Sequence, residues 1–167
     1  MSRLLFALLS LCLLSATAIM PASAKPPGML VRNDLYLSST EYDPARDPKA
    51  DLAASIVAAQ TSGKRILLDV GGEWCIWCHI LDDYLARKKD VGDAFAASFV
   101  IVKITWEPKK QNEAFLSAYP KADGYPHFYV LDSSGKFLAS QNTSPLEKGE
   151  SYNRQKMLAF AATWKAP

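Results

Sequence analysis

The chain of 167 residues is poor in cysteine and histidine, and charge of neither sign dominates it. Three cysteines are too few for the disulfide framework of a small secreted scaffold, which joins distant segments with several pairs. The formal net charge is only +2 at pH 7, and the basic cluster at residues 87–89 is short. Nucleic-acid binding needs lysine and arginine gathered on one face, so we expect none. The length suits one globular domain with a sizeable core.

The first 24 residues have the organisation of a secretory signal. Arg3 supplies the positive start, residues 4–19 are almost wholly apolar, and Ala-Ser-Ala at 22–24 fits the cleavage rule. The apolar run is shorter than the roughly 20 residues that a spanning helix needs. We therefore expect removal of residues 1–24, export across the inner membrane and a periplasmic protein that keeps only Cys75 and Cys78.

The remaining sequence alternates helical and strand patterns. Residues 25–46 are rich in proline and polar side chains, and we interpret them as a lead-in segment with a short strand at 35–37. Residues 47–167 form one predicted domain, whose first helix is capped by Asp47 and ended by Gly63. The expected elements are helices over 48–62, 75–89, 91–97, 112–119 and 151–164, and strands over 65–70, 99–105, 127–131 and 136–140, with a polar loop over 141–150. This order indicates an α/β fold with a mixed sheet.

Residues 74–79, Trp-Cys-Ile-Trp-Cys-His, carry the chemistry of the chain. Cys75 and Cys78 lie one helical turn apart, directly after an apolar strand. Two thiols at this spacing can close a small disulfide ring or bind a metal, and with His79 they also match the attachment site of a c-type haem. A disulfide across so short a ring stabilises a fold little, so we expect a chemical role.

A helix that begins near Cys75 would direct its N–H groups and dipole at that sulfur and favour the thiolate. Cys75 would then be an exposed nucleophile, and the more buried Cys78 would attack a mixed disulfide formed there. Asp69 interrupts the apolar strand, and burial would raise its pKa. It would take the proton from Cys78, or else only hydrogen-bond to backbone at the edge of the core.

These residues resemble the active-site segment of the thioredoxin superfamily, in the spacing of Leu-Asp at 68–69 and Trp-Cys-x-x-Cys at 74–78. Gly-Tyr-Pro at 124–126 resembles the family's cis-proline turn, and Lys103 falls where thioredoxins place a lysine near the buried acid. The likeness covers residues 48–165 and is closest to exported thioredoxin-like proteins, among them the C-terminal domain of the bacterial thiol:disulfide interchange reductase. It implies a thioredoxin fold, with a central mixed β-sheet flanked by helices.

The resemblance also implies an exported thiol-disulfide oxidoreductase that exchanges a Cys75–Cys78 dithiol or disulfide with protein substrates. No metal or organic cofactor would be required. Trp74, Tyr125 and Pro126 would shape the substrate groove. Protein thiols and disulfides would be the partners, with a membrane thiol:disulfide carrier among them, and the chain would act as a monomer.

Two departures from thioredoxin concern the redox potential. Ile76 and Trp77 stand between the cysteines, and neither can stabilise a thiolate by charge. They favour a reductant over a strong oxidant without fixing the direction. His79 follows the second cysteine, where relatives often carry lysine. It would favour the thiolate if protonated, or it would be an ordinary exposed helix residue.

Three other interpretations remain open on the sequence. A c-type haem would take His79 as one axial ligand and would need a second, for which the candidates are Met29, Met157 and His127. Zinc would need a fourth ligand, and adjacent Cys78 and His79 diverge on a helix. A binding or chaperone module could use the same fold without redox chemistry.

Overall fold

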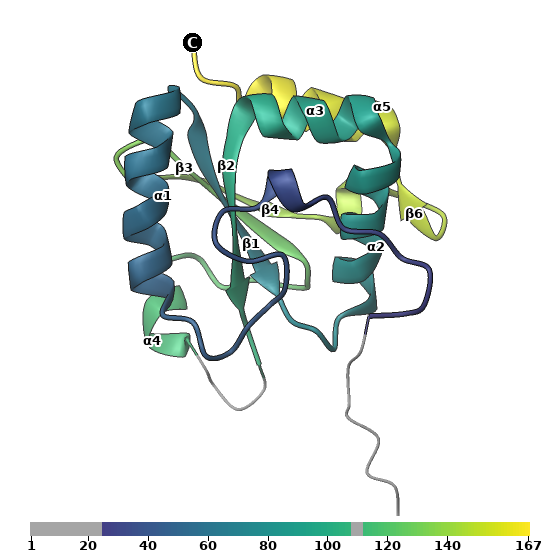
Figure 1. Ribbon diagram of the computed structural model, residues 1–167, viewed down its shortest axis with the longest axis horizontal. Helices are drawn as coiled ribbons and strands as arrows, with labels where there is room; N and C mark the ends of the chain where they lie inside the picture. The colour runs from purple at the N-terminus through teal and green to yellow at the C-terminus, as the bar shows by residue number, and fades with distance from the viewer. Residues whose placement is uncertain (1–24, 108–111) are drawn as a thin grey trace, which may run out of the picture.

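The computed structural model describes residues 25–107 and 112–167. The predicted signal segment, residues 1–24, lies outside the described residues. The centre of the fold is a four-stranded mixed sheet in the order β2-β1-β3-β4 (Figure 1). Its strands are β1 (Arg65–Gly71), β2 (Phe99–Thr105), β3 (His127–Leu131) and β4 (Phe137–Asn142). β1 pairs parallel with β2 and antiparallel with β3, so the predicted mixed sheet is confirmed.

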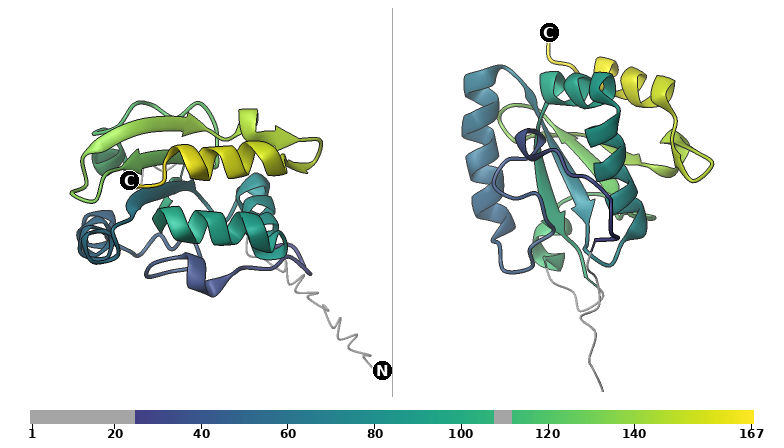
Figure 2. Two further views of the ribbon diagram at one scale, coloured as in Figure 1. Left: turned by 90° about the horizontal axis from the view of Figure 1, so that it is seen from above. Right: turned by 45° about the vertical axis from the view of Figure 1, so that its right-hand side comes forward.

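Alternating side chains of the central strand divide the core into two parts. Leu67 contributes to the cluster that contains α2 (Ile76–Arg87), α3 (Lys89–Ser98) and α5 (Arg154–Thr163). Ile66 and Leu68 contribute to the cluster under α1 (Pro48–Ser62) and the short α4 (Glu113–Leu116). Helices therefore cover both faces, and α3 and α5 lie side by side on one of them (Figure 2). Side chains 67, 69 and 71 share the α2 face because alternate residues of a strand point the same way.

The lead-in segment packs across the α2 face, in front of the sheet in Figure 1. The predicted strand at 35–37 is wrong: a 3-10 turn, η1 (Asn33–Leu35), is followed by a single bridge between Tyr36 and Ile101 of β2. Leu35 and Tyr36 are buried in the core, which fixes the segment by hydrophobic packing.

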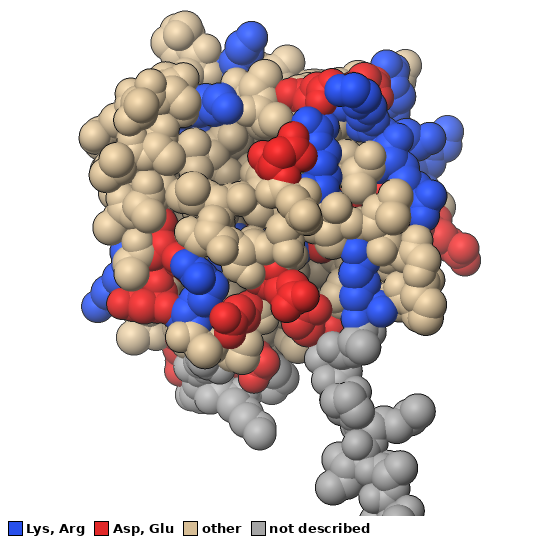
Figure 3. Space-filling view, viewed as in Figure 1, with Lys and Arg blue, Asp and Glu red and all other residues tan. Residues whose placement is uncertain are grey.

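Polar contacts hold the lead-in segment on α2 and α3 as well. Arg32 Nη1 lies 2.7 Å from Asp93 Oδ1, and the Leu30 N–H donates to Asp83 Oδ1 at 2.8 Å. Acidic and basic side chains are mixed on this face of the molecule (Figure 3). Exposed ion pairs of this kind contribute little individually, at most about 1 kcal/mol. The buried side chains therefore do most to fix the segment.

The polar loop predicted at 141–150 is structured. β4 extends to Asn142, and a 3-10 turn, η2 (Ser144–Leu146), leads into a hairpin of β5 (Glu147–Lys148) and β6 (Ser151–Tyr152). Leu146 and Tyr152 are buried against the α2 side of the core, so two apolar side chains anchor an otherwise polar stretch. Gly149, with φ of 62°, makes the turn.

The other differences concern helix ends. α4 covers 113–116 rather than 112–119, α5 begins at Arg154 after the cap Asn153, and α2 ends at Arg87. Among the residues with described positions, no helix is long and apolar enough to span a bilayer.

Candidate redox-active disulfide site

Cys75 and Cys78 form a disulfide at the start of α2. The adjoining glycines end β1, and a turn from Gly72 O to the Cys75 N–H, at 2.9 Å, places Cys75 at the helix N-cap. Its sulfur accepts a hydrogen bond from the Cys78 N–H at 3.2 Å. This is the predicted position, and the N–H and helix dipole there favour a thiolate once the disulfide is reduced.

The predicted exposure of Cys75 is wrong. Cys75 is 4% exposed and Cys78 is fully buried. Tyr42 packs in one cluster with both cysteines, and Trp77 and Tyr125 pack against that cluster. The expected order, with Cys78 the deeper of the two, nevertheless holds.

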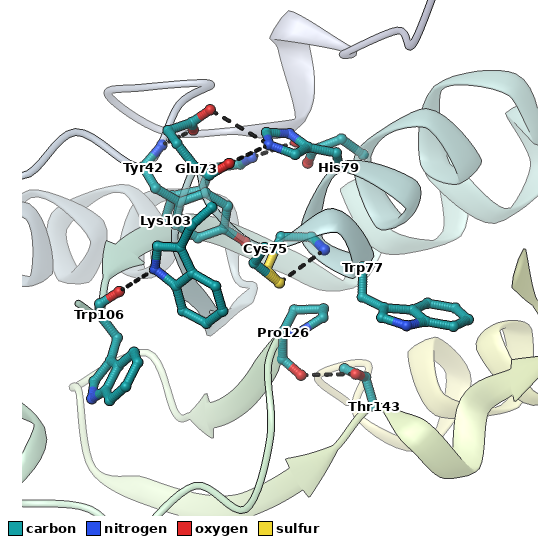
Figure 4. Close-up of a disulfide and its surroundings, with 12 residues drawn as sticks. Tyr42, Glu73, Cys75, Trp77, His79, Lys103, Trp106, Pro126 and Thr143 are labelled. Atoms are coloured by element: carbon teal, nitrogen blue, oxygen red, sulfur yellow. Dashed lines mark hydrogen bonds and ion pairs between the residues drawn. A yellow bond between two sulfur atoms is a disulfide. The ribbon is translucent and has the colours of Figure 1, made fainter. Parts of the chain in front are cut away.

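The Tyr125–Pro126 peptide bond is cis and stands directly before β3. Pro126 faces the disulfide, and its carbonyl accepts a hydrogen bond from Thr143 Oγ1 at 2.7 Å (Figure 4). Thr143 follows β4, so a residue from the segment predicted as a loop holds this turn. Sequence reasoning missed Thr143, for which the pattern offered no signal.

Aromatic rings form the wall beside the disulfide. Trp74 is 45% exposed, and its Nε1 donates to Trp106 O at 3.1 Å. Trp106 in turn stacks on Tyr125, with ring centroids 4.6 Å apart. A cavity of about 740 Å³ opens beside these three rings and continues over Tyr119 and Tyr129. Sequence reasoning missed Trp106, although an aromatic residue directly after the parallel strand β2 was a usable signal.

The two residues between the cysteines face different surroundings. Ile76 is 48% exposed on the first turn of α2. Trp77 is partly buried, and its ring meets the edge of Tyr152 with centroids 5.9 Å apart. Ile76 is therefore the one available to an incoming partner, and neither brings charge to the disulfide.

Asp69 lies on the α2 face of β1 and is 1% exposed. Burial raises its pKa to about 7, while Lys103 acts to lower the pKa and Asp82 to raise it. Asp69 and Lys103 are neighbours in the register of β1 and β2, as the resemblance implied. A carboxyl group with a pKa near neutrality is suited to accept and release protons.

Lys103 does not pair with Asp69. Its Nζ lies 2.6 Å from Asp82 Oδ2, and both side chains are almost fully buried. Asp82 also accepts a hydrogen bond from the Tyr36 hydroxyl at 2.5 Å. The sequence analysis missed Asp82, although its place four residues after Cys78 puts it on the same face of α2 and was the available signal.

Tyr36 and Tyr42 bring the lead-in segment into this site. The Lys103 ammonium lies 4.7 Å from the Tyr36 ring centroid and 4.3 Å from that of Tyr42. Such cation–π contacts help to stabilise a buried charge. Neither tyrosine was identified from the sequence, because nothing in residues 25–46 indicates which side chains reach the domain.

His79 is 4% exposed, so the alternative of an exposed helix residue is wrong. Its Nε2 lies 2.7 Å from Glu73 O and donates to that carbonyl, which can only accept (Figure 4). Glu73 Oε1 accepts the Tyr42 N–H at 2.8 Å. His79 and Glu73 thus tie the loop before the cysteines to the lead-in segment. Over residues 25–107 and 112–167, no three His, Cys, Asp or Glu side chains gather as a metal-ligand group.

Comparison with known proteins gives a family, one curated relative and two solved structures. Residues 47–133 match the family model described as thioredoxin-like. The disulfide bond reductase DsbH of Chlamydia pneumoniae is 24% identical over 86 residues, which are 47% of this chain and 52% of that relative. The chain thus spans about half the length of this curated relative.

Two solved structures are similar in fold. A disulphide isomerase from Xylella fastidiosa Temecula1 is 28% identical, with a TM-score of 0.63, over 73% of this chain and 94% of that one. The oxidised C-terminal domain of DsbD from Neisseria meningitidis is 23% identical, with a TM-score of 0.51, over 71% of this chain and 97% of that one. The predicted thioredoxin fold is confirmed.

Proposed function

The chain belongs to the thioredoxin-like family, and from that premise we propose that it is an exported thiol-disulfide oxidoreductase acting on protein disulfides. The observation that carries the proposal is the Cys75–Cys78 disulfide at the N-cap of α2, opposite Pro126. The similar proteins named as a disulfide bond reductase and a disulphide isomerase support thiol-disulfide exchange as the chemistry.

The reaction begins with the reduced protein. The Cys75 thiolate attacks one sulfur of a client disulfide, a Cys75–client bond forms, and the client's other sulfur leaves as a thiolate. Cys78 then attacks the Cys75 sulfur, the intramolecular disulfide forms, and the second client sulfur is released. Two electrons pass from the dithiol to the client, and Cys78 must lose its proton in the second step.

The reducing direction is favoured by the residues around Cys75. A strong oxidant needs its reduced form stabilised by groups that hold the thiolate. Here Ile76 and Trp77 carry no charge, and His79 Nε2 is hydrogen-bonded to Glu73 O instead of a cysteine sulfur. The thiolate is stabilised mainly by the helix N-terminus, which suits a reductant of moderate to low potential.

Trp74, Tyr125 and Pro126 would shape the groove that receives the client. Trp74 and Ile76, the neighbours of Cys75 in the chain, are both partly exposed and offer apolar contact. Because Cys75 itself is buried, a client must displace or pass this aromatic wall to reach it. Asp69 would manage the proton of Cys78.

Export, a periplasmic location, monomeric action and a membrane thiol:disulfide carrier as electron donor belong to the same proposal. The likeness to the DsbD domain supports the last of these by fold alone. Size-exclusion chromatography of the mature chain tests the monomer, and fractionation of expressing cells tests the location.

The activity is tested with insulin reduction by a dithiol. Wild-type protein should accelerate insulin precipitation, and Cys75→Ser should abolish the acceleration. Unchanged activity in that variant would overturn the role of Cys75. The potential of the Cys75–Cys78 couple, measured against glutathione, should lie nearer about −270 mV than about −120 mV. A Soret band in the purified protein would instead identify haem.

A further inference from the structure

Two buried polar atoms beside the disulfide have no hydrogen-bond partner among the described residues. One is the hydroxyl of Tyr42 and the other is Oδ1 of Asp69. Leaving such groups without a well-formed hydrogen bond in a buried site is unfavourable. Both lie on the α2 face of the sheet. The two groups are near enough for the Tyr42 hydroxyl to lower the pKa of Asp69, although no hydrogen bond of ordinary length and angle joins that hydroxyl to Oδ1. This loosely held donor and acceptor could move a proton between them.

The geometry over Gly71 places the Tyr42 hydroxyl end next to Cys78. A Cβ built on Gly71 would lie 2.5 Å from Cys78 Sγ and 3.0 Å from Tyr42 Cζ, the carbon that bears the hydroxyl. Tyr42 is 1% exposed and packs in one cluster with both cysteines. The tyrosine and the resolving sulfur therefore share the space that the missing side chain of Gly71 leaves.

Asp69 reaches the same place from the strand. It stands two residues before Gly71, so its side chain emerges on the same face of β1. The Asp69 carboxyl is close enough to act on Tyr42: burial raises the pKa of the Tyr42 hydroxyl well above 10, and the neighbouring Asp69 charge raises it further. Tyr42 is thus near both the sulfur that must lose a proton and the carboxylate suited to accept one.

We propose that the Tyr42 hydroxyl relays the proton of Cys78 to Asp69 when Cys78 resolves a mixed disulfide. The inference rests on the proposed thiol-disulfide exchange. As the Cys78 sulfur attacks Cys75, its proton passes to the Tyr42 oxygen while the Tyr42 proton passes to Asp69 Oδ1. Tyr42 ends the step unchanged, Asp69 ends it protonated, and the two electrons leave with the departing client sulfur.

A phenol in this position would not act as a base by itself. A free tyrosinate is strongly disfavoured at a buried site beside two carboxylates, so both protons must move in one event. The charged and titratable groups that face the relay come from every packed element: Asp69 on β1, Lys103 on β2, Asp82 on α2, Tyr36 in the lead-in segment and Tyr152 on β6. Lys103 is neutralised by Asp82, which leaves Asp69 to receive the proton.

The lead-in segment is held so that Tyr42 stays in place. The Tyr42 N–H donates to Glu73 Oε1 at 2.8 Å, and the Lys103 ammonium lies against its ring. Phenylalanine at position 42 would keep the ring and these contacts and remove only the hydroxyl. Tyr42→Phe is therefore the appropriate variant, and Tyr84→Phe is its control because Tyr84 is a buried tyrosine on α2 outside the cysteine cluster.

The relay is tested in stopped flow with the reduced protein and 4,4′-dithiodipyridine. The first equivalent of thiopyridone reports attack by Cys75, and the second reports resolution by Cys78. Tyr42→Phe should leave the first phase within about twofold of wild type and slow the second by about tenfold to a hundredfold near neutral pH. Tyr84→Phe should match wild type in both phases.

The pH profile and solvent isotope effect separate a relay from a structural role. In wild type the second phase should follow the titration of Asp69, with a curved proton inventory. In Tyr42→Phe the second phase should rise about tenfold per pH unit, as expected for hydroxide-dependent ionisation of Cys78, with a linear inventory. Tyr42→Phe combined with Asp69→Asn should be no slower than the slower single variant, because the two act in series.

Resolution at the wild-type rate in Tyr42→Phe, or equal slowing of both phases, would overturn the relay. The test does not depend on the client, because the small disulfide replaces it. A protein that fails to reduce insulin but shows the predicted two-phase behaviour would refute the proposed function and leave the relay standing.

Discussion

Replacing Asp69 with asparagine should stabilise the oxidised protein at neutral pH and leave its stability unchanged in acid. An unfolded chain releases this proton near pH 3.8, whereas burial raises the pKa in the folded protein to about 7. Between those values the folded state binds more protons than the unfolded state, so the free energy of unfolding falls as the pH rises. Above about pH 7 Asp69 is ionised in both states, and the free energy of unfolding has fallen by the full amount.

The size of the effect follows from the two pKa values. Each pH unit between 3.8 and about 7 is worth 1.36 kcal/mol, so ionised Asp69 lowers the free energy of unfolding by up to about 4 kcal/mol. Asparagine carries no charge at any pH. Asp69→Asn should therefore exceed wild type by up to about 4 kcal/mol near pH 8, and the difference should shrink toward pH 4.

Urea denaturation of the oxidised protein, followed by tryptophan fluorescence at several pH values, measures this difference. The amide itself adds a constant offset, so the slope with pH is the diagnostic quantity. A difference between Asp69→Asn and wild type that does not change with pH would refute the assignment of a raised pKa to Asp69.

Three further outcomes are expected. Asp82→Asn should lower the free energy of unfolding by about 3–5 kcal/mol in the same denaturation assay, because it leaves Lys103 buried without its partner, and a stabilised variant would contradict the pairing. Gly71→Ala should cost about 1–3 kcal/mol, since its Cβ would meet Cys78 Sγ at 2.5 Å, whereas Gly124→Ala has open space and should stay within about 0.5 kcal/mol. Cys78→Ser should accumulate a mixed disulfide with a client, visible on non-reducing gels and lost on reduction; free client alone would exclude its resolving role.

Local sequence patterns were sufficient for the elements that carry the cysteines. An apolar run ended by two glycines predicts β1, and Cys75 at a helix start follows from the break and the helical spacing after it. Asp69 was expected to be buried because an apolar strand has no surface for a carboxylate. These inferences succeed because each depends on near neighbours in the chain.

Contacts between distant segments could not be predicted in the same way. Nothing within residues 25–46 indicates that Tyr36 reaches Asp82 or that Tyr42 covers Cys78. The hairpin after Asn142 was missed because two buried side chains, Leu146 and Tyr152, decide its position and its remaining residues are polar.

By itself, the sequence determined which groups are available for chemistry: two thiols one helical turn apart, an apolar strand with one carboxylate before them, and a proline turn far along the chain. Tertiary structure alone decided how that chemistry is controlled. It buried Cys75 among aromatic rings, paired Lys103 with Asp82 and packed Tyr42 against both cysteines. The physical reason is that burial and charge pairing depend on which distant side chains surround a group. Local sequence patterns do not show which side chains those are.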